Sequence, residues 1–334
     1  MERLRIAVWG PGYFGQKWMR EVVRSPDTEL AGIITRTPDR AETLRAELGL
    51  DTLRAFSGPQ DAQDAGVQAV VIAVPQTLHR DAAVEAIDAG LHVLLEKPLA
   101  MNLAEARDVV NAAWAHPSST VMVTQNFRWR PHALCLRTAV GDGLIGKIGH
   151  VSLECRQAIK RSTTDAWRER MEDPYLGDFA IHHVDLIRYI TGLEVEQAFA
   201  TSFRPPGSWF DGRSAAAAIL GLSGGVVASY HGTMVASGFP TPQEGLMTVV
   251  GESGTLHLDA RYRVILATTG DPIVLPHPPI PEGELGHGLR QLVESVRGGK
   301  RPETDVEDNF KSFAALMAIV ESAATGAPAG VETA

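Results

Sequence analysis

Residues 177–189 hold two carboxylates and an imidazole at helical spacing. Asp178, His182 and Asp185 are separated by four and three residues, which places them on one face of a helix. A carboxylate one turn away can fix the tautomer of an imidazole and raise its basicity, so His182 is a candidate general base. A metal site and a merely polar helix face remain alternatives. We expect no metal, because His183 points about 100° away and no further ligand cluster is evident.

A second candidate is Lys97, which follows an apolar run over residues 92–96 that predicts a parallel strand. Ligands of parallel sheets bind in the crevice at the carboxyl ends of the strands. A lysine there can hydrogen-bond a substrate hydroxyl and stabilise a developing alkoxide. Pro98 could form a cis peptide bond that directs Lys97 into the crevice. A solvated surface lysine is the alternative interpretation.

A glycine-rich turn near the start of the chain predicts a dinucleotide site. An apolar strand over residues 6–9 leads into Gly10, Gly12 and Gly15, and a helix-compatible sequence follows. Gly10 permits the tight turn, Gly12 leaves room for a pyrophosphate, and Gly15 lets the helix lie close to the strand. The helix N-terminus then offers free N–H groups to phosphate. The alternative is a glycine-rich turn without a ligand.

The end of the second predicted strand bears on the choice of dinucleotide. NAD sites usually carry Asp or Glu there, whereas this chain has Thr35, Arg36 and Arg40. A hydroxyl and two guanidinium groups suit a 2′-phosphate, so the sequence favours NADP and leaves NAD possible. The alternative is that both arginines are solvated residues at a helix start.

The candidate residues must be positioned by secondary-structure elements. In the first part of the chain, strand and helix patterns alternate. Such alternation predicts an α/β fold with a doubly wound parallel sheet, and we assign residues 1–124 to an NAD(P)-binding Rossmann domain. After the first strand, we expect strands over residues 30–35, 69–75, 92–96 and 121–124, and helices over residues 38–48, 79–89 and 103–114.

The pattern changes after Gln125, and residues 125–334 predict an α+β domain with a large, mostly antiparallel open sheet. One helix is expected over residues 176–191 and two near the end, while residues 271–284 predict an extended proline-rich loop and the last six residues a loose tail. The expected strands cover residues 149–156, 195–203, 215–222, 226–231, 246–250, 255–258 and 264–267.

Composition excludes several classes of function. The net charge of −9 is spread along the chain without a basic stripe, so we expect no nucleic-acid partner. Two cysteines, Cys135 and Cys155, form neither a disulfide framework nor a metal motif and predict small core residues in a reducing compartment. No signal core or bilayer-spanning run is present, so we expect a cytoplasmic protein with no membrane partner.

In this order, the motifs resemble those of the glucose–fructose oxidoreductase/inositol dehydrogenase (Gfo/Idh/MocA) family. The resemblance covers nearly the whole chain and is carried by six motifs, which are residues 10–15, 74–79, 89–100, the Asp178/His182 pair, residues 250–256 and residues 321–326. Four departures concern the substrate rather than the chemistry: Asp173-Pro174 replaces a common Gly-Gly, Ala180 a common Gly and Gln76 a common Asn, and His183 is an additional histidine.

The resemblance implies an NAD(P)-dependent sugar or cyclitol dehydrogenase or reductase, assembled as a homodimer or homotetramer through the sheet of the second domain. In such enzymes the lysine matching Lys97 hydrogen-bonds the reacting hydroxyl, the histidine matching His182 accepts its proton, and the aspartate matching Asp178 supports that histidine. Together with Arg128, these three residues would contact the substrate. The residues expected to contact the cofactor are Gly10, Gly12, Tyr13, Phe14, Gly15, Thr35, Arg36, Arg40, Val74, Pro75, Gln76, His79, Glu96, Lys97, Asn126, Trp167 and Arg168.

Two other functions on the same fold remain open. One is a regulator that binds the dinucleotide without chemistry. The other is a lyase or glycosidase that oxidises and re-reduces one carbon, so that the dinucleotide is used only transiently. The presence of Lys97, Asp178 and His182 together favours the oxidoreductase.

Overall fold

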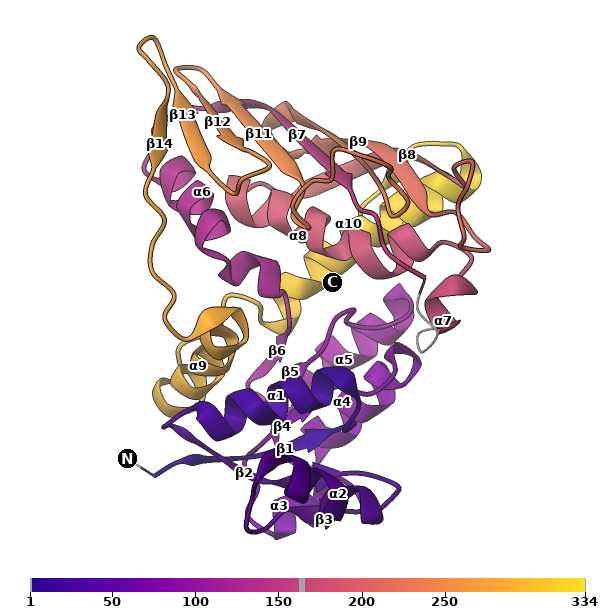
Figure 1. Ribbon diagram of the computed structural model, residues 1–334, viewed down its shortest axis with the longest axis vertical. Helices are drawn as coiled ribbons and strands as arrows, with labels where there is room; N and C mark the ends of the chain where they lie inside the picture. The colour runs from indigo at the N-terminus through magenta and orange to yellow at the C-terminus, as the bar shows by residue number, and fades with distance from the viewer. Residues whose placement is uncertain (1, 162–165, 334) are drawn as a thin grey trace. The chain divides into compact units, whose positions relative to one another are not determined.

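The computed structural model describes residues 2–161 and 166–333 and divides the chain into two compact units (Figure 1). The first unit comprises the chain up to Asn126 together with Glu282–Phe310. The second comprises Phe127–Pro281 together with Lys311–Thr333. Each unit has its own sheet and its own core.

The first unit is built on a six-stranded sheet in which every pairing is parallel, with strand order β3-β2-β1-β4-β5-β6. The four residues of β4 are all buried, as expected for a strand that is covered on both faces. The predicted doubly wound sheet is therefore confirmed. The strands are β1 (Leu4–Trp9), β2 (Thr28–Ile34), β3 (Arg54–Phe56), β4 (Ala69–Ile72), β5 (His92–Leu95) and β6 (Val121–Val123).

Helices flank this sheet because each has one apolar stripe. In α1 (Tyr13–Arg24), the stripe is formed by Trp18, Met19 and Val22, all of which are buried. The sequence did not predict β3 or α3, which are three and six residues long and too short to show a period. The other helices of the unit are α2 (Asp39–Leu48), α3 (Pro59–Asp64), α4 (His79–Asp88), α5 (Leu103–Ala115), α9 (Gly283–Gly298) and the start of α10 (Val306–Thr325).

The second unit is built on a nine-stranded sheet with strand order β14-β13-β12-β11-β7-β10-β9-β8-β15. Only the β10–β7 pairing is parallel among the pairings that the structure describes, which confirms the mostly antiparallel sheet. The strands are β7 (Ile148–Arg156), β8 (Val195–Phe203), β9 (Ala215–Leu222), β10 (Val226–Thr233), β11 (Leu246–Gly251), β12 (Thr255–Leu258), β13 (Val264–Ala267), β14 (Ile273–Leu275) and β15 (Ala329–Gly330).

The helices of this unit are α6 (Pro131–Gly141), α7 (Ala166–Glu169), α8 (Ala180–Thr191) and the later part of α10. Figure 1 shows α6 and α8 beneath one face of the sheet, and all twelve residues of α8 are buried. A single π-helical turn, Tyr175–Phe179, precedes α8 and is called the π-turn below. It explains why the predicted helix over residues 176–191 is regular only from Ala180.

Three expectations for the second unit were wrong. The tail is not loose, because Ala329–Gly330 pairs with β8 and the Val331 N–H donates to the Glu196 carbonyl, which satisfies part of a sheet edge. The proline-rich loop contains β14, which pairs with β13. The sequence also missed α6, which begins at Pro131 as first-turn prolines allow.

Two smaller observations complete the fold. Cys135 and Cys155 are both buried and free, which confirms their prediction as core residues. Among the residues that the structure describes, no helix is long and apolar enough to cross a membrane.

Candidate active site

The glycine turn after β1 fits the pyrophosphate of a dinucleotide on steric grounds. Gly10 has φ +92°, and a Cβ placed there would lie 2.6 Å from the Ala73 carbonyl oxygen. A Cβ on Gly15 would lie 2.1 Å from the Gly10 oxygen, so α1 can pack this close only with glycine. A Cβ on Gly12 would meet nothing within 4 Å, so this position faces open space. The turn therefore leaves a cradle lined by backbone.

The N-terminus of α1 opens onto this cradle. Gly12 caps the helix without any side-chain hydrogen bond, and the first turn holds no acidic residue. The first N–H groups of the helix and its positive dipole end therefore remain for an anion. Tyr13 is 71% exposed, and the Lys17 ammonium lies 4.5 Å from its ring centroid and 5.1 Å from that of Phe14.

Among the residues that follow β2, Arg36 has a guanidinium group without an ion-pair partner in the described part of the chain. Arg36 is exposed and makes no hydrogen bond or ion pair with any residue in the described ranges. Arg40 lies 3.9 Å from Glu47, at the limit of an ion pair. Thr35 accepts a hydrogen bond from the Thr37 N–H at 3.1 Å through its hydroxyl oxygen. A phosphate group at this place would meet Arg36 without first breaking an internal ion pair.

The carboxyl ends of β4 and β5 are tied together by His79. Its Nδ1 lies 2.6 Å from the Pro98 carbonyl oxygen and its Nε2 lies 3.1 Å from the Val74 carbonyl oxygen. The pKa of His79 is lowered, mainly because the imidazole is buried. The Lys97–Pro98 peptide is cis, as the sequence suggested, and Lys97 is half-buried. His79 thus holds the two loops that carry the predicted contacts from Val74 to Gln76 and at Lys97.

Glu96 joins the end of β5 to α1. The Trp18 indole N–H donates to the Glu96 carboxyl at 2.7 Å, and both side chains are buried. Burial raises the pKa of Glu96 more than the Trp18 hydrogen bond and the nearby Lys97 charge lower it. Asn126 is the last residue of the first unit's leading segment and begins a 3₁₀ turn that continues to Trp129.

In the second unit, the π-turn and α8 carry the predicted acid–base residues. Asp178 and His182 are both about 5% exposed. The Arg168 guanidinium donates to the Asp178 carboxylate at 2.7 Å and lies 4.8 Å from the ring centroid of Trp167. The His182 ring stacks on Phe127 with centroids 4.3 Å apart and an angle of 17° between planes. Both side chains are therefore held by partners that the sequence did not identify for them.

The third residue of the predicted helix face, Asp185, is bound to Arg128. Two hydrogen bonds of 2.6 and 2.5 Å join them, and the side chains are only 1% and 4% exposed. The Ser312 hydroxyl donates to the same carboxylate at 2.7 Å. Arg128 thus has a structural contact, and its role in substrate binding stays a prediction. Fifty-seven residues separate the pair, and no local pattern could have revealed it.

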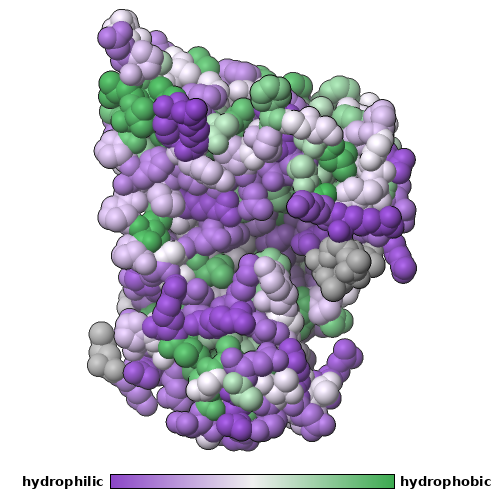
Figure 2. All heavy atoms as spheres, in the orientation of Figure 1, coloured by the Kyte–Doolittle hydropathy of each residue, from purple (hydrophilic) through white to green (hydrophobic). Residues whose placement is uncertain are grey.

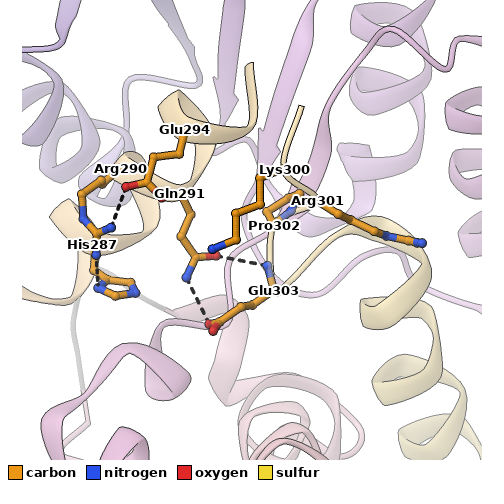
Figure 3. A pocket seen from close by; sticks show the side chains of 8 residues that line it. All are labelled: His287, Arg290, Gln291, Glu294, Lys300, Arg301, Pro302 and Glu303. Atoms are coloured by element: carbon orange, nitrogen blue, oxygen red, sulfur yellow. Dashed lines mark hydrogen bonds and ion pairs between the residues drawn. The ribbon is translucent and has the colours of Figure 1, made fainter. Parts of the chain in front are cut away.

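Among residues 2–161 and 166–333, no group of three or more His, Cys, Asp or Glu side chains could hold a metal ion. A hollow of about 170 Å³ lies between α9 and the loop after it (Figure 3). Its arginines are already neutralised, because Arg290 binds Glu294 and Arg301 binds Asp305. These two arginines are therefore already committed to carboxylates.

Comparison with known proteins identifies the family. Residues 4–125 match the model of an oxidoreductase family with an NAD-binding Rossmann fold, and residues 134–257 match the GFO/IDH/MocA C-terminal domain. The two matches together span most of the chain. The protein belongs to the GFO/IDH/MocA family of oxidoreductases, which confirms the family predicted from the motifs.

Similar proteins align with the chain over nearly its full length. The chain is 27% identical to D-apiose dehydrogenase of Paraburkholderia graminis, over 98% of this chain and 89% of that protein. It is 26% identical to 1,5-anhydro-D-fructose reductase of Ensifer adhaerens, over 98% and 99%. An oxidoreductase from Agrobacterium radiobacter, solved with NAD⁺, L-tartaric acid and magnesium, has a TM-score of 0.90 at 22% identity, covering 99% of each chain. This structural likeness shows the shared fold.

Proposed function

We propose that the protein transfers a hydride between a nicotinamide dinucleotide and a hydroxyl or keto carbon of a sugar, sugar derivative or cyclitol. The observation that carries this proposal is the backbone cradle at Gly12, bordered by two glycines that sterics require and open to an uncapped helix N-terminus. The substrate class is supported by the similar proteins, whose names specify apiose and anhydrofructose. We propose that residues 1–124 form the main cofactor-binding domain and that residues 125–334 form the substrate-binding domain, with Lys97 of the first domain also contacting the substrate.

We assign the proton chemistry to three residues. In the direction of oxidation, His182 accepts the proton of the substrate hydroxyl and Lys97 donates a hydrogen bond to the same oxygen, which stabilises the developing alkoxide. Asp178 supports the imidazole, and Arg168 holds the Asp178 carboxylate through its 2.7 Å hydrogen bond. The bound nicotinamide would supply the hydride acceptor. Stacking on Phe127 limits the rotation of the His182 ring.

We further propose that NADP is preferred over NAD. The support is Arg36, whose exposed guanidinium makes no ion pair within the described part of the chain. Arg pairs with phosphate through charge and fork geometry, so a 2′-phosphate next to β2 would find a ready partner.

We also propose a homodimer or homotetramer that forms through the nine-stranded sheet. On the face opposite α8, Phe199 and Ile219 are paired across β8 and β9 and are 52% and 50% exposed. Figure 2 shows a further hydrophobic cluster over β13 and β14, where Ile273 and Val274 are more than half exposed. Apolar surface of this kind marks an interface. A monomeric wild type in analytical ultracentrifugation, or an Ile219→Arg variant that stays assembled, would contradict this interface.

The proposed activity is tested by turnover with NAD⁺ and NADP⁺ across a panel of sugars, sugar acids and inositols. We expect reduction of the nicotinamide with at least one of them. His182→Ala and Lys97→Met should lower kcat about 100-fold or more with an unchanged cofactor Kd, whereas the control His116→Ala should not. Tight cofactor binding without turnover would indicate the regulator. Product release without net reduction would indicate the lyase or glycosidase.

A further inference from the structure

A chain of buried polar groups runs beneath the candidate acid–base residues and takes no part in the mechanism above. His183 Nε2 lies 2.8 Å from the Gln243 carbonyl oxygen, and its Nδ1 lies 2.9 Å from the Tyr230 hydroxyl. The Tyr230 and Tyr175 hydroxyls are 2.7 Å apart. His183, Tyr175 and Tyr230 are at most 1% exposed, so each polar group depends on the others for its hydrogen bonds.

Every hydrogen in this chain of polar groups has an acceptor when His183 is neutral. The Gln243 carbonyl can only accept, so Nε2 carries the proton and donates, which leaves Nδ1 as an acceptor. The two tyrosine hydroxyls supply two hydrogens, one for Nδ1 and one for the bond between the hydroxyls. Burial lowers the pKa of His183 to about 4, which keeps the ring neutral at ordinary pH. All members of the chain are then satisfied.

One end of this chain is fixed against the sheet by a glycine. A Cβ placed on Gly232 of β10 would lie 1.8 Å from the Tyr175 hydroxyl oxygen and 2.9 Å from the Cys155 carbonyl oxygen. The hydroxyl of Tyr175 therefore sits directly against the backbone of β10, in space that any other residue would fill. Tyr175 is the first residue of the π-turn.

The other end of the chain is His183, in the first turn of α8. The two anchored residues thus bracket the segment 175–183, which contains both Asp178 and His182. A π-turn is a rare element that occurs mostly as single turns within helices, often at functional sites. The hydrogen-bonded chain holds a residue at each end of this segment, and satisfied buried networks of this kind make the surrounding structure rigid.

We propose that His183 is a positioning residue, which through Tyr230 and Tyr175 holds the π-turn and thereby fixes how Asp178 and His182 are presented. The proposal rests on the proposed function, because it takes Asp178 and His182 as the acid–base pair. It also explains the histidine that is additional to the family motif. The polar chain sets geometry, and no proton of the reaction passes through it.

The first test removes single hydroxyls or the imidazole. Tyr175→Phe, Tyr230→Phe and His183→Leu should lower kcat about 10- to 100-fold, with KM and cofactor Kd nearly unchanged. His183→Gln can still donate to the Gln243 carbonyl and accept from Tyr230, so it should recover much of the loss seen in His183→Leu. Tyr262→Phe is the matched control, since it removes a hydroxyl from a half-exposed tyrosine of the same unit.

A second measurement does not depend on turnover. Crystal structures of Tyr230→Phe and Gly232→Ala should show residues 175–179 changed from a π-turn, with Asp178 displaced, while the rest of α8 is kept. An unchanged π-turn in both, or wild-type kcat in folded His183→Leu, would overturn the proposal. If instead wild type and His182→Ala are equally inactive on every substrate, the proposed function fails, and the crystal structures still decide the positioning role.

Discussion

In the turn after β1, the proposed function depends on side chains that are absent, whereas in the π-turn and α8 it depends on buried polar side chains. Gly10 and Gly15 are required because backbone atoms occupy the space a Cβ would need, and the cradle offers backbone N–H groups to a phosphate. Asp178 and His182 are held instead by Arg168, ten residues before Asp178, and by Phe127, which lies much earlier in the sequence. The backbone site thus depends on close approaches of main-chain atoms at Gly10 and Gly15, whereas the side-chain site depends on particular side-chain partners.

The largest effect is expected in the glycine turn. Gly15→Ala places a Cβ 2.1 Å from the Gly10 oxygen, so it should destabilise the first unit by about 4 kcal/mol or more and abolish cofactor binding. Gly12→Ala meets no protein atom and should keep the wild-type melting temperature while weakening cofactor binding. Thermal unfolding and fluorescence titration with NADPH check both. Equal melting temperatures and equal cofactor affinities in the two variants would show that Gly15 and Gly12 do not differ in the way proposed.

The next effect concerns the buried ion pair of the second unit. Asp185→Asn removes the carboxylate that binds the Arg128 guanidinium, and it should lower the free energy of unfolding by about 3–5 kcal/mol in urea titrations. The control Glu294→Gln breaks an exposed pair with Arg290 and should cost at most about 1 kcal/mol. Similar losses in both variants would show that burial does not distinguish these pairs.

A pH effect should appear at His183. Its pKa falls from 6.5 to about 4 on folding, so its stabilising contribution is complete above pH 6.5 and is lost as the pH falls toward 4. We expect up to about 3 kcal/mol less stability of the second unit over that window. His183→Gln cannot take up this proton and should flatten the dependence in urea unfolding at a series of pH values. If the stability of the variant fell with pH as steeply as that of the wild type, His183 would not be the neutral, buried group that we describe.

The smallest effect is expected at Arg36. Arg36→Ala should raise the Kd of NADP⁺ about tenfold, or about 1.4 kcal/mol, and leave that of NAD⁺ unchanged. Arg45→Ala, whose guanidinium is bound to Glu42, is the control and should change neither. Isothermal titration with both cofactors gives the answer. Tighter wild-type binding of NAD⁺ than of NADP⁺ would overturn the assignment.

The contrast also explains how much the sequence could predict. Both sheets, the glycine turn and α8 follow from local patterns, because parallel strands are continuous apolar runs and turns need glycine at defined places. The elements β3, β14 and β15 are too short to show a period. The Arg128–Asp185 pair joins residues far apart in sequence, and Gln243 contacts His183 from 60 residues further along the chain. Such contacts are properties of packing and have no signal in a single sequence.

The central claim is that a hydride passes between the nicotinamide and a carbon of a polyol substrate. The direct measurement uses NADPH or NADH carrying deuterium at C4 of the nicotinamide, with the keto form of the best substrate found in the panel. We expect deuterium on the newly formed carbinol carbon, detected by NMR, and its loss in His182→Ala. With a cofactor deuterated at both C4 positions, a carbinol carbon that carries no deuterium, or whose new hydrogen comes from solvent, would contradict the account.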